Sequence, residues 1–112
     1  MSEIIVLIRL LAALYGVDPQ YAVCIAEHES AFDQFAVGDH GQARGLWQWH
    51  EDSIRAAMRH GRLTWDWQRQ GDPRLDVAMS TAAAMEAMSQ GWDWWSTDYL
   101  CEGHALSANK GR

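Results

Sequence analysis

The sequence contains two Asp-Pro pairs, at residues 18–19 and 72–73, and each marks the start of a helix. Asp is a good helix N-cap, and Pro suits the first helical position because its fixed φ matches the helix and its missing N–H is not needed there. We therefore expect one helix from Pro19 to about Ser30. We expect a second, long and rich in Ala and Met, from the second pair to about Gln90, closed by Gly91.

Glycines delimit the elements between these two helices and ahead of them. The apolar residues 3–15 predict a first helix, buried on most sides, that ends at Gly16. Residues 51–60 predict another helix that ends at Gly61. Residues 33–45 contain three glycines among polar side chains, so they predict a loop or a short irregular hairpin.

The remaining segments are less regular. Residues 64–70 are ambiguous, residues 92–100 predict a Trp-rich turn or helix, and residues 107–112 predict a loose tail. The sequence therefore predicts a mainly α fold. It is a small helical domain with a glycine-rich loop or short β-hairpin near its middle.

Length and charge narrow the class of protein. A chain of 112 residues with 48% hydrophobic and 21% charged residues predicts one domain over residues 1–112 with a modest core. Its formal net charge of -6 argues against a nucleic-acid partner and against a polybasic membrane-surface protein.

The apolar run at residues 4–14 is about half the length of a helix that spans a membrane, and no signal-peptide cleavage site follows it. We therefore expect neither membrane insertion nor an export signal. We expect a monomer made in the cytoplasm.

The cysteines and histidines do not define a site by themselves. Cys24 and Cys101 could form one disulfide or remain two buried thiols, and the sequence leaves both possibilities open. No histidine pair has a metal-binding spacing, and neighbours in the run Glu27-His28-Glu29 point apart on a helix. We therefore expect no metal and no cofactor.

Glu29 is the strongest candidate for acid chemistry. It falls at the C-terminal end of the predicted helix, on the same face as four apolar or small residues, Tyr21, Ala22, Ile25 and Ala26. Partial desolvation and the negative end of the helix dipole both favour a protonated carboxyl, which can protonate a leaving-group oxygen. The alternative is an exposed helix-end carboxylate with no chemical task.

A glycine-rich stretch from Gly38 to Trp49 supplies a second carboxyl. Its three glycines let the backbone turn tightly and approach a ligand closely. Asp39 could face Glu29 across a groove, as the paired carboxylates of glycosidases do, or could bond its own backbone in the turn. The amide of Gln48 can both donate to and accept from sugar hydroxyls or N-acetyl groups.

The seven tryptophans suggest either a Trp-packed core or a groove that stacks ligands. Trp47 and Trp49 lie within the glycine-rich stretch and are candidates for the groove or for the floor beneath it. Trp65 and Trp67 are candidates for its far wall. We expect the tryptophans at residues 92–95 to pack the C-terminal segment onto the core.

Three motifs in order resemble the lysozyme superfamily: Glu29-Ser30, Gly38-Asp39-His40-Gly41 and Gly45-Leu46-Trp47-Gln48. They are most similar to the branch of soluble lytic transglycosylases and goose-type lysozymes, in which a catalytic Glu-Ser precedes G-L-x-Q. The goose-type members also carry G-D-x-G at the interval seen here. Trp47 departs from the usual Met, and the Ala-Tyr-Asn motif of the transglycosylases is missing, which leaves Tyr99 as a candidate groove residue.

The resemblance implies an α+β lysozyme-like fold and an enzyme that cleaves the β-1,4 bond between N-acetylmuramic acid and N-acetylglucosamine in peptidoglycan glycan strands. Glu29 would be the general acid and Asp39 would position the attacking water, giving hydrolysis with inversion. Ser30, Trp47, Gln48 and Tyr99 would contact the sugar or hold the surroundings of the acid.

Two alternative functions, and one expected origin, follow from the same residues. Lytic transglycosylases lack the second carboxylate and let the substrate's own 6-hydroxyl attack, so Asp39 favours a hydrolase. A non-catalytic glycan-binding or structural module is the rival of another class, although such a module needs neither Glu29 nor Asp39. A short chain without an export signal fits a phage endolysin, released by a separate membrane-permeabilising protein, or a phage-delivered lysin.

Overall fold

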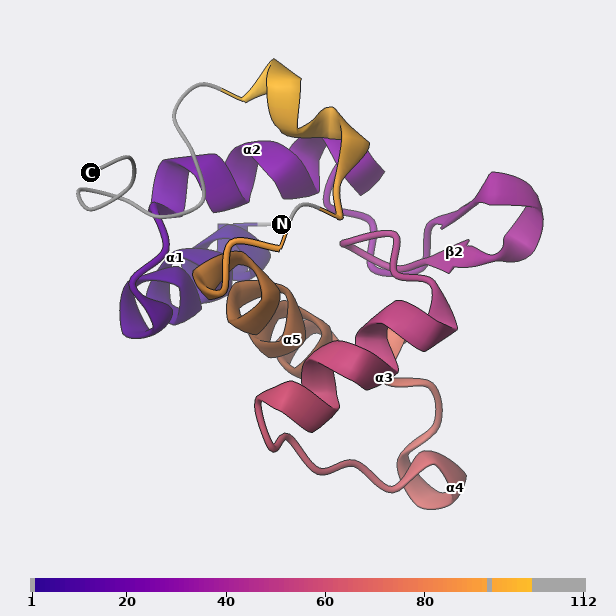
Figure 1. The fold of residues 1–112 in the computed structure, drawn as a ribbon. Helices are drawn as coiled ribbons and strands as arrows, with labels where there is room; N and C mark the ends of the chain where they lie inside the picture. Colours follow the sequence, from indigo (N-terminus) through magenta and orange to yellow (C-terminus); the bar gives the residue numbers. More distant parts are fainter. Residues whose placement is uncertain (1, 93, 102–112) are drawn as a thin grey trace.

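A computed structural model describes residues 2–92 and 94–101 and shows a mainly helical domain with one small hairpin (Figure 1). The predicted tail at residues 107–112 lies outside this part of the chain. The α-helices are α1 (Ser2–Tyr15), α2 (Pro19–Ser30), α3 (Glu51–His60), α4 (Trp67–Gln70) and α5 (Val77–Ser89). The strands and 3-10 helices are β1 (Val37–Gly38), η1 (Asp39–Gly41), β2 (Ala43–Arg44), η2 (Pro73–Leu75) and η3 (Ser96–Leu100).

The two Asp-Pro pairs begin different elements. The first prediction is confirmed: the Asp18 carboxylate accepts the N–H of Gln20 at 3.0 Å, and α2 runs from Pro19 to Ser30. The second is corrected, because Asp72 caps only the short η2. The backbone of Asp76 is extended, and its carboxylate accepts the N–H of Met79 at 2.8 Å, so α5 starts from this second cap.

The core lies between α1, α2, α3 and α5. Ile8 and Ile25 are fully buried there, as are Ile54 and Met85. The expectation that α1 is buried on most sides is wrong. Three of its apolar side chains, Val6, Leu10 and Leu14, are 55%, 59% and 79% exposed, since only one face of the helix packs on the core. No helix within the described residues has both the length and the apolar character needed to cross a membrane.

The glycine-rich stretch forms the predicted hairpin. Strands β1 and β2 pair antiparallel with Val37 opposite Arg44, and Figure 1 shows the hairpin beside the end of α2. Gly45 follows β2 with φ +86, and a Cβ atom at this position would lie 2.0 Å from the carbonyl oxygen of Arg74. Only glycine fits here, because both the left-handed backbone and the close approach exclude a side chain.

The C-terminal segment packs on the core through tryptophans, as predicted. Trp95 is 6% exposed, and its Nε1 donates a hydrogen bond to the carbonyl oxygen of Trp47 at 2.9 Å. Its ring meets those of Trp47 and Trp49 edge to face, at 6.2 and 5.3 Å between centroids. Trp94 contacts Trp49 and Trp92 in the same cluster.

The structure also answers the open question about the cysteines. Cys24 and Cys101 form a disulfide that joins α2 to the residue after η3.

Candidate active site

Glu29 lies in the last turn of α2 with a half-buried side chain. The helix ends directly after it, since Ala31 and Phe32 both adopt a left-handed backbone, with φ of 53 and 64. The predicted apolar face is confirmed, and its four members Tyr21, Ala22, Ile25 and Ala26 are all buried. The carboxyl is thus presented at the edge of the core rather than in free solvent.

The segment η3 supplies the partner of this carboxyl. The Thr97 hydroxyl donates a hydrogen bond to Glu29 Oε2 at 2.7 Å. Next to it, Asp98 accepts a hydrogen bond from the hydroxyl of Tyr21. Sequence reasoning missed both residues. Only the pairing of Cys24 with Cys101, four residues after Thr97, could have indicated that η3 lies against α2.

Asp39 lies at the turn of the hairpin, in η1, with φ +50 and a side chain that is 56% exposed. Its Oδ2 is 2.9 Å from Nε2 of His50, the N-cap residue of α3. No hydrogen bond or ion pair joins Asp39 to Glu29, both of which the structure describes. The two carboxyls therefore come from neighbouring elements, but each has its own partner.

Gln48 joins the two sides of the hairpin base. Its Nε2 donates to the carbonyl oxygens of Ala36, at 3.2 Å, and Gly45, at 3.0 Å. Both amide hydrogens are thus used on the backbone, and Oε1 lies so close to Gly38 that a Cβ atom there would be 2.4 Å away. In this structure Gln48 shapes the hairpin, and its amide hydrogens are not free for a sugar.

The chain matches the model of a known protein family. The model of the transglycosylase SLT domain matches residues 7–101, from α1 to the disulfide. The chain belongs to this family. Its members are lysozyme-like lytic transglycosylases, glycosidases that act on the glycan strands of peptidoglycan. The fold resemblance inferred from the three sequence motifs is thereby confirmed, while no curated protein and no solved structure matches the chain.

Trp47 does not reach the surface of this SLT domain. Its side chain is 0% exposed, and Nε1 donates to Thr81 Oγ1 at 3.0 Å within the core. A side chain with no exposed surface cannot contact a substrate, so the expectation that Trp47 binds sugar is corrected to a role in the core. The large ring replaces the family's usual Met and meets the ring of Trp95 edge to face.

Two other predicted residues differ in exposure. The Ser30 hydroxyl donates back along α2 to the carbonyl oxygen of Ala26 at 3.2 Å. Tyr99 is 82% exposed and lines a hollow of about 370 Å³ together with Trp94, Trp95, Ser96 and Asp98.

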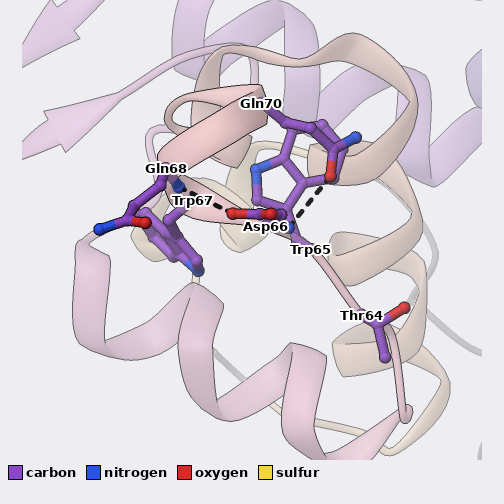
Figure 2. Close-up of a pocket in the computed structure, with 6 residues that line it drawn as sticks. All are labelled: Thr64, Trp65, Asp66, Trp67, Gln68 and Gln70. Carbon is purple, nitrogen blue, oxygen red and sulfur yellow. Dashed lines mark hydrogen bonds between the residues drawn. The ribbon is translucent and has the colours of Figure 1, made fainter.

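A larger hollow lies elsewhere. It measures about 620 Å³ and lies around α4, at the end of the SLT domain away from α2 (Figure 1). Figure 2 shows its lining residues, Thr64, Trp65, Asp66, Trp67, Gln68 and Gln70. Trp65 Nε1 donates to the carbonyl oxygen of Gly71 at 2.9 Å, and the guanidinium of Arg55 stacks 3.7 Å from the ring centroid of Trp67. Both rings are half-buried at the surface of this outer segment.

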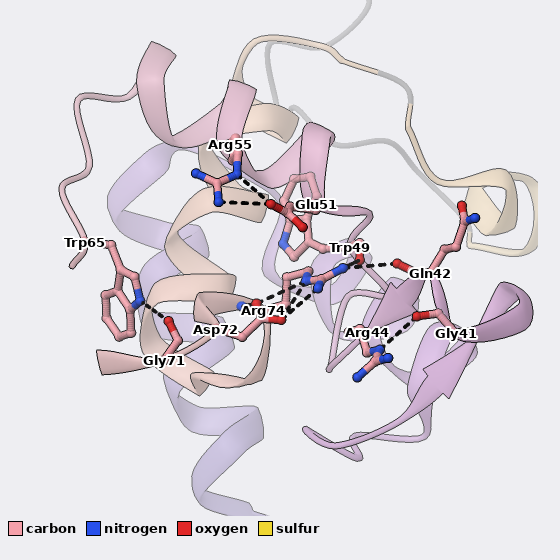
Figure 3. A network of polar contacts seen from close by, with 10 residues as sticks. All are labelled: Gly41, Gln42, Arg44, Trp49, Glu51, Arg55, Trp65, Gly71, Asp72 and Arg74. Carbon is pink, nitrogen blue, oxygen red and sulfur yellow. Dashed lines mark hydrogen bonds and ion pairs between the residues drawn. The ribbon is translucent and has the colours of Figure 1, made fainter. Parts of the chain in front are cut away.

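A polar network fixes the hairpin to η2 (Figure 3). Arg74 pairs with Asp72 at 2.7 Å and donates to the carbonyl oxygens of Gln42, at 3.1 Å, and Trp49, at 3.4 Å. Burial alone would raise the pKa of Asp72. The hydrogen bonds from Arg74 and the charges of Arg74 and Arg44 outweigh burial and hold that pKa below its ordinary value.

One group of side chains has the composition of a metal site. The potential ligand atoms of Cys24, His28 and Cys101 lie within 4.8 Å of one another. A metal binds cysteine as the thiolate, and the disulfide uses both of these sulfurs. In the oxidised protein the group therefore offers a metal only the histidine.

Proposed function

We propose that this SLT domain cleaves the β-1,4 bond between N-acetylmuramic acid and N-acetylglucosamine with Glu29 as the general acid. The observation that carries the proposal is the state of the Glu29 carboxyl. It is half-buried at the end of an apolar helix face, and Thr97 holds Oε2 while Oε1 has no partner among the described residues. An oriented carboxyl with one open oxygen can deliver a proton to a glycosidic oxygen.

The outcome of cleavage depends on the attacking group. We propose hydrolysis, with Asp39 positioning the water. Asp39 occupies the position of the second carboxylate in the goose-type pattern, and its exposed place at the hairpin turn supports access to water. An inverting mechanism needs room for a water between two carboxyl groups, roughly 6.5–9.5 Å apart.

Transglycosylation is the second candidate, because the matching family is one of lytic transglycosylases. The contact of Asp39 with His50 also favours it, since it gives the carboxylate a structural role between the hairpin turn and α3. Mass spectrometry of the products of wild type and Asp39→Asn separates the two. Hydrolysis predicts reducing ends and a large loss of rate in the variant, whereas anhydromuramic ends with an unchanged rate would rule out the water role.

The assignment of Glu29 is tested with Glu29→Gln on purified peptidoglycan. A general acid contributes about 10²- to 10⁴-fold to the rate, so we expect a loss of that size with the melting temperature retained. Glu27→Gln is the matched control, because Glu27 is exposed on the same helix two residues away. Equal clearing by Glu29→Gln would disprove the assignment. Binding without turnover by the wild type would favour the glycan-binding module instead.

A further inference from the structure

The carboxyl of Glu29 depends on another element for its orientation. The neighbouring hydroxyl of Ser30 bonds to Ala26, and α2 ends before a further turn could contribute. Among the described residues, Thr97 is the hydrogen-bond partner of this carboxyl. We propose that Thr97 is a positioning residue for Glu29 and that the Cys24–Cys101 disulfide holds Thr97 in place, an inference that rests on the proposed role of Glu29 as the acid.

Three contacts fasten the C-terminal segment along α2. They join Tyr21 to Asp98, Cys24 to Cys101, and Glu29 to Thr97. Residues 21 and 29 are eight apart, so the contacts cover about 12 Å of helix. Figure 1 shows η3 running beside α2, as this pattern requires.

Thr97 lies between two fixed points. On one side, buried Trp95 donates to the carbonyl oxygen of Trp47. On the other side, Cys101 is 4% exposed and is bonded to α2. The segment between them is a single 3-10 helix of 5 residues, which has few internal hydrogen bonds of its own. Loss of the disulfide would leave the Cys101 side of Thr97 held to α2 only by the hydrogen bond between Tyr21 and Asp98.

The bond from Thr97 decides which way the carboxyl faces. A hydroxyl 2.7 Å from Oε2 restricts rotation about the last side-chain torsion, which is otherwise broad and roughly two-fold for Glu. With Oε2 held by Thr97, Oε1 is left for the leaving-group oxygen. The contribution is one of orientation, so its loss should lower the rate of the chemical step more than the affinity for the glycan.

The first experiment measures kcat and KM on soluble glycan chains of alternating N-acetylglucosamine and N-acetylmuramic acid. Thr97→Val keeps the shape of the side chain but removes the hydroxyl, and we expect kcat to fall about 10- to 100-fold with KM within about two-fold. Thr97→Ser restores the hydroxyl and should recover most of kcat. Thr64→Val, at an exposed threonine near α4, is the matched control and should behave as wild type.

The outcomes separate this inference from the proposed function. A kcat for Thr97→Val equal to that of wild type, with Glu29→Gln inactive, overturns the positioning role and leaves the acid in place. An equal loss in Thr97→Ser and Thr97→Val also overturns it, since the hydroxyl would then not matter. An active Glu29→Gln variant disproves the proposed function itself.

A double-mutant cycle tests the disulfide. The double variant Cys24→Ser/Cys101→Ser should have a lower kcat than wild type when Thr97 is present. The same double substitution should cause little further loss when it is added to Thr97→Val, because both changes remove the same orientation of Glu29. Fully additive losses would show that the disulfide does not act through Thr97. Wild type treated with a thiol reductant provides the same comparison without mutation, and thermal unfolding confirms that each protein is folded at the assay temperature.

Discussion

The end of α2 and the hairpin each carry one of the two carboxyls, but they are held in opposite ways. The partners of α2 come from far along the chain: Thr97 is 68 residues from Glu29, and the disulfide spans 77 residues. The base of the hairpin is closed by nearby residues, since the bonds of Gln48 reach only 3 and 12 residues back. Its long-range contact is with Arg74, which donates to the carbonyl oxygen of Gln42, 32 residues away.

The surroundings of Glu29 and of Asp39 therefore form in different ways. The surroundings of Glu29 exist only when the C-terminal segment has docked on α2, so they report on tertiary structure. The turn that carries Asp39 is local, with Asp39, His40 and Gly41 all in a left-handed backbone, and its side chain has one exposed contact, with His50. Three substitutions on the hairpin side test how much each of its contacts contributes to stability.

The largest effect is expected for Gly45→Ala. The new Cβ atom would lie 2.0 Å from the carbonyl oxygen of Arg74, and backbone cannot move aside as a flexible side chain can. Together with the left-handed φ of +86, this predicts a loss of about 3–5 kcal/mol in the free energy of unfolding. Denaturant unfolding measures the loss.

The control for this substitution is Gly71→Ala. Gly71 has a similar φ of +85, but nothing lies within 4 Å of its Cβ position. With ψ of -156 its backbone also lies in a region that favours glycine, so it should lose only the conformational term, about 1–3 kcal/mol. Equal losses in the two variants would mean that the close approach to Arg74 does not contribute to the free energy of unfolding. The stability of the hairpin would then not depend on its packing against η2.

The same contrast explains what the sequence could predict. The Asp18-Pro19 start of α2 and the glycine-rich hairpin follow from local rules of capping and backbone freedom, and the structure confirms both. The predicted start of the second long helix was wrong. Asp72 and Asp76 are both good caps, and the sequence does not show which of them begins the helix.

The partners of the site were harder to predict. Glu29 was visible from its place on an apolar face, but Thr97 is a common residue in a short 3-10 segment, and its role arises only from docking. The place of Trp47 was left open for a similar reason. A tryptophan beside a binding motif can lie in the groove or under it, and only the packing against Thr81 and Trp95 decides.

A smaller effect is expected for Asp72→Asn, which weakens the network between η2 and the hairpin. We expect a loss of about 1–2 kcal/mol at neutral pH, because the charged bond to Arg74 is removed from a largely buried site. The pKa of Asp72 is lowered in the folded state, so its contribution is present above the unfolded value of about 3.9 and is lost as pH falls through the folded value.

Denaturant unfolding of both proteins at a series of pH values checks this sign. The stability difference between wild type and Asp72→Asn should be largest at neutral pH and shrink below about pH 4, because protonated Asp72 no longer favours the folded state. The remaining carboxyls titrate in both proteins and cancel in the difference. A difference that grows towards acid pH would contradict the assigned direction of the shift.

The smallest effect is expected for His50→Ala. The side chains of the His50–Asp39 pair are 45% and 56% exposed, so solvent screens their attraction, and such pairs contribute about 0–1 kcal/mol. Unfolding free energy should therefore change by less than about 1 kcal/mol, and any change should shrink in 1 M salt. A loss above about 2 kcal/mol would show that Asp39 is held as firmly as Glu29. In that case the hairpin carboxyl would be a fixed part of the site, and the contrast between the two regions would not hold.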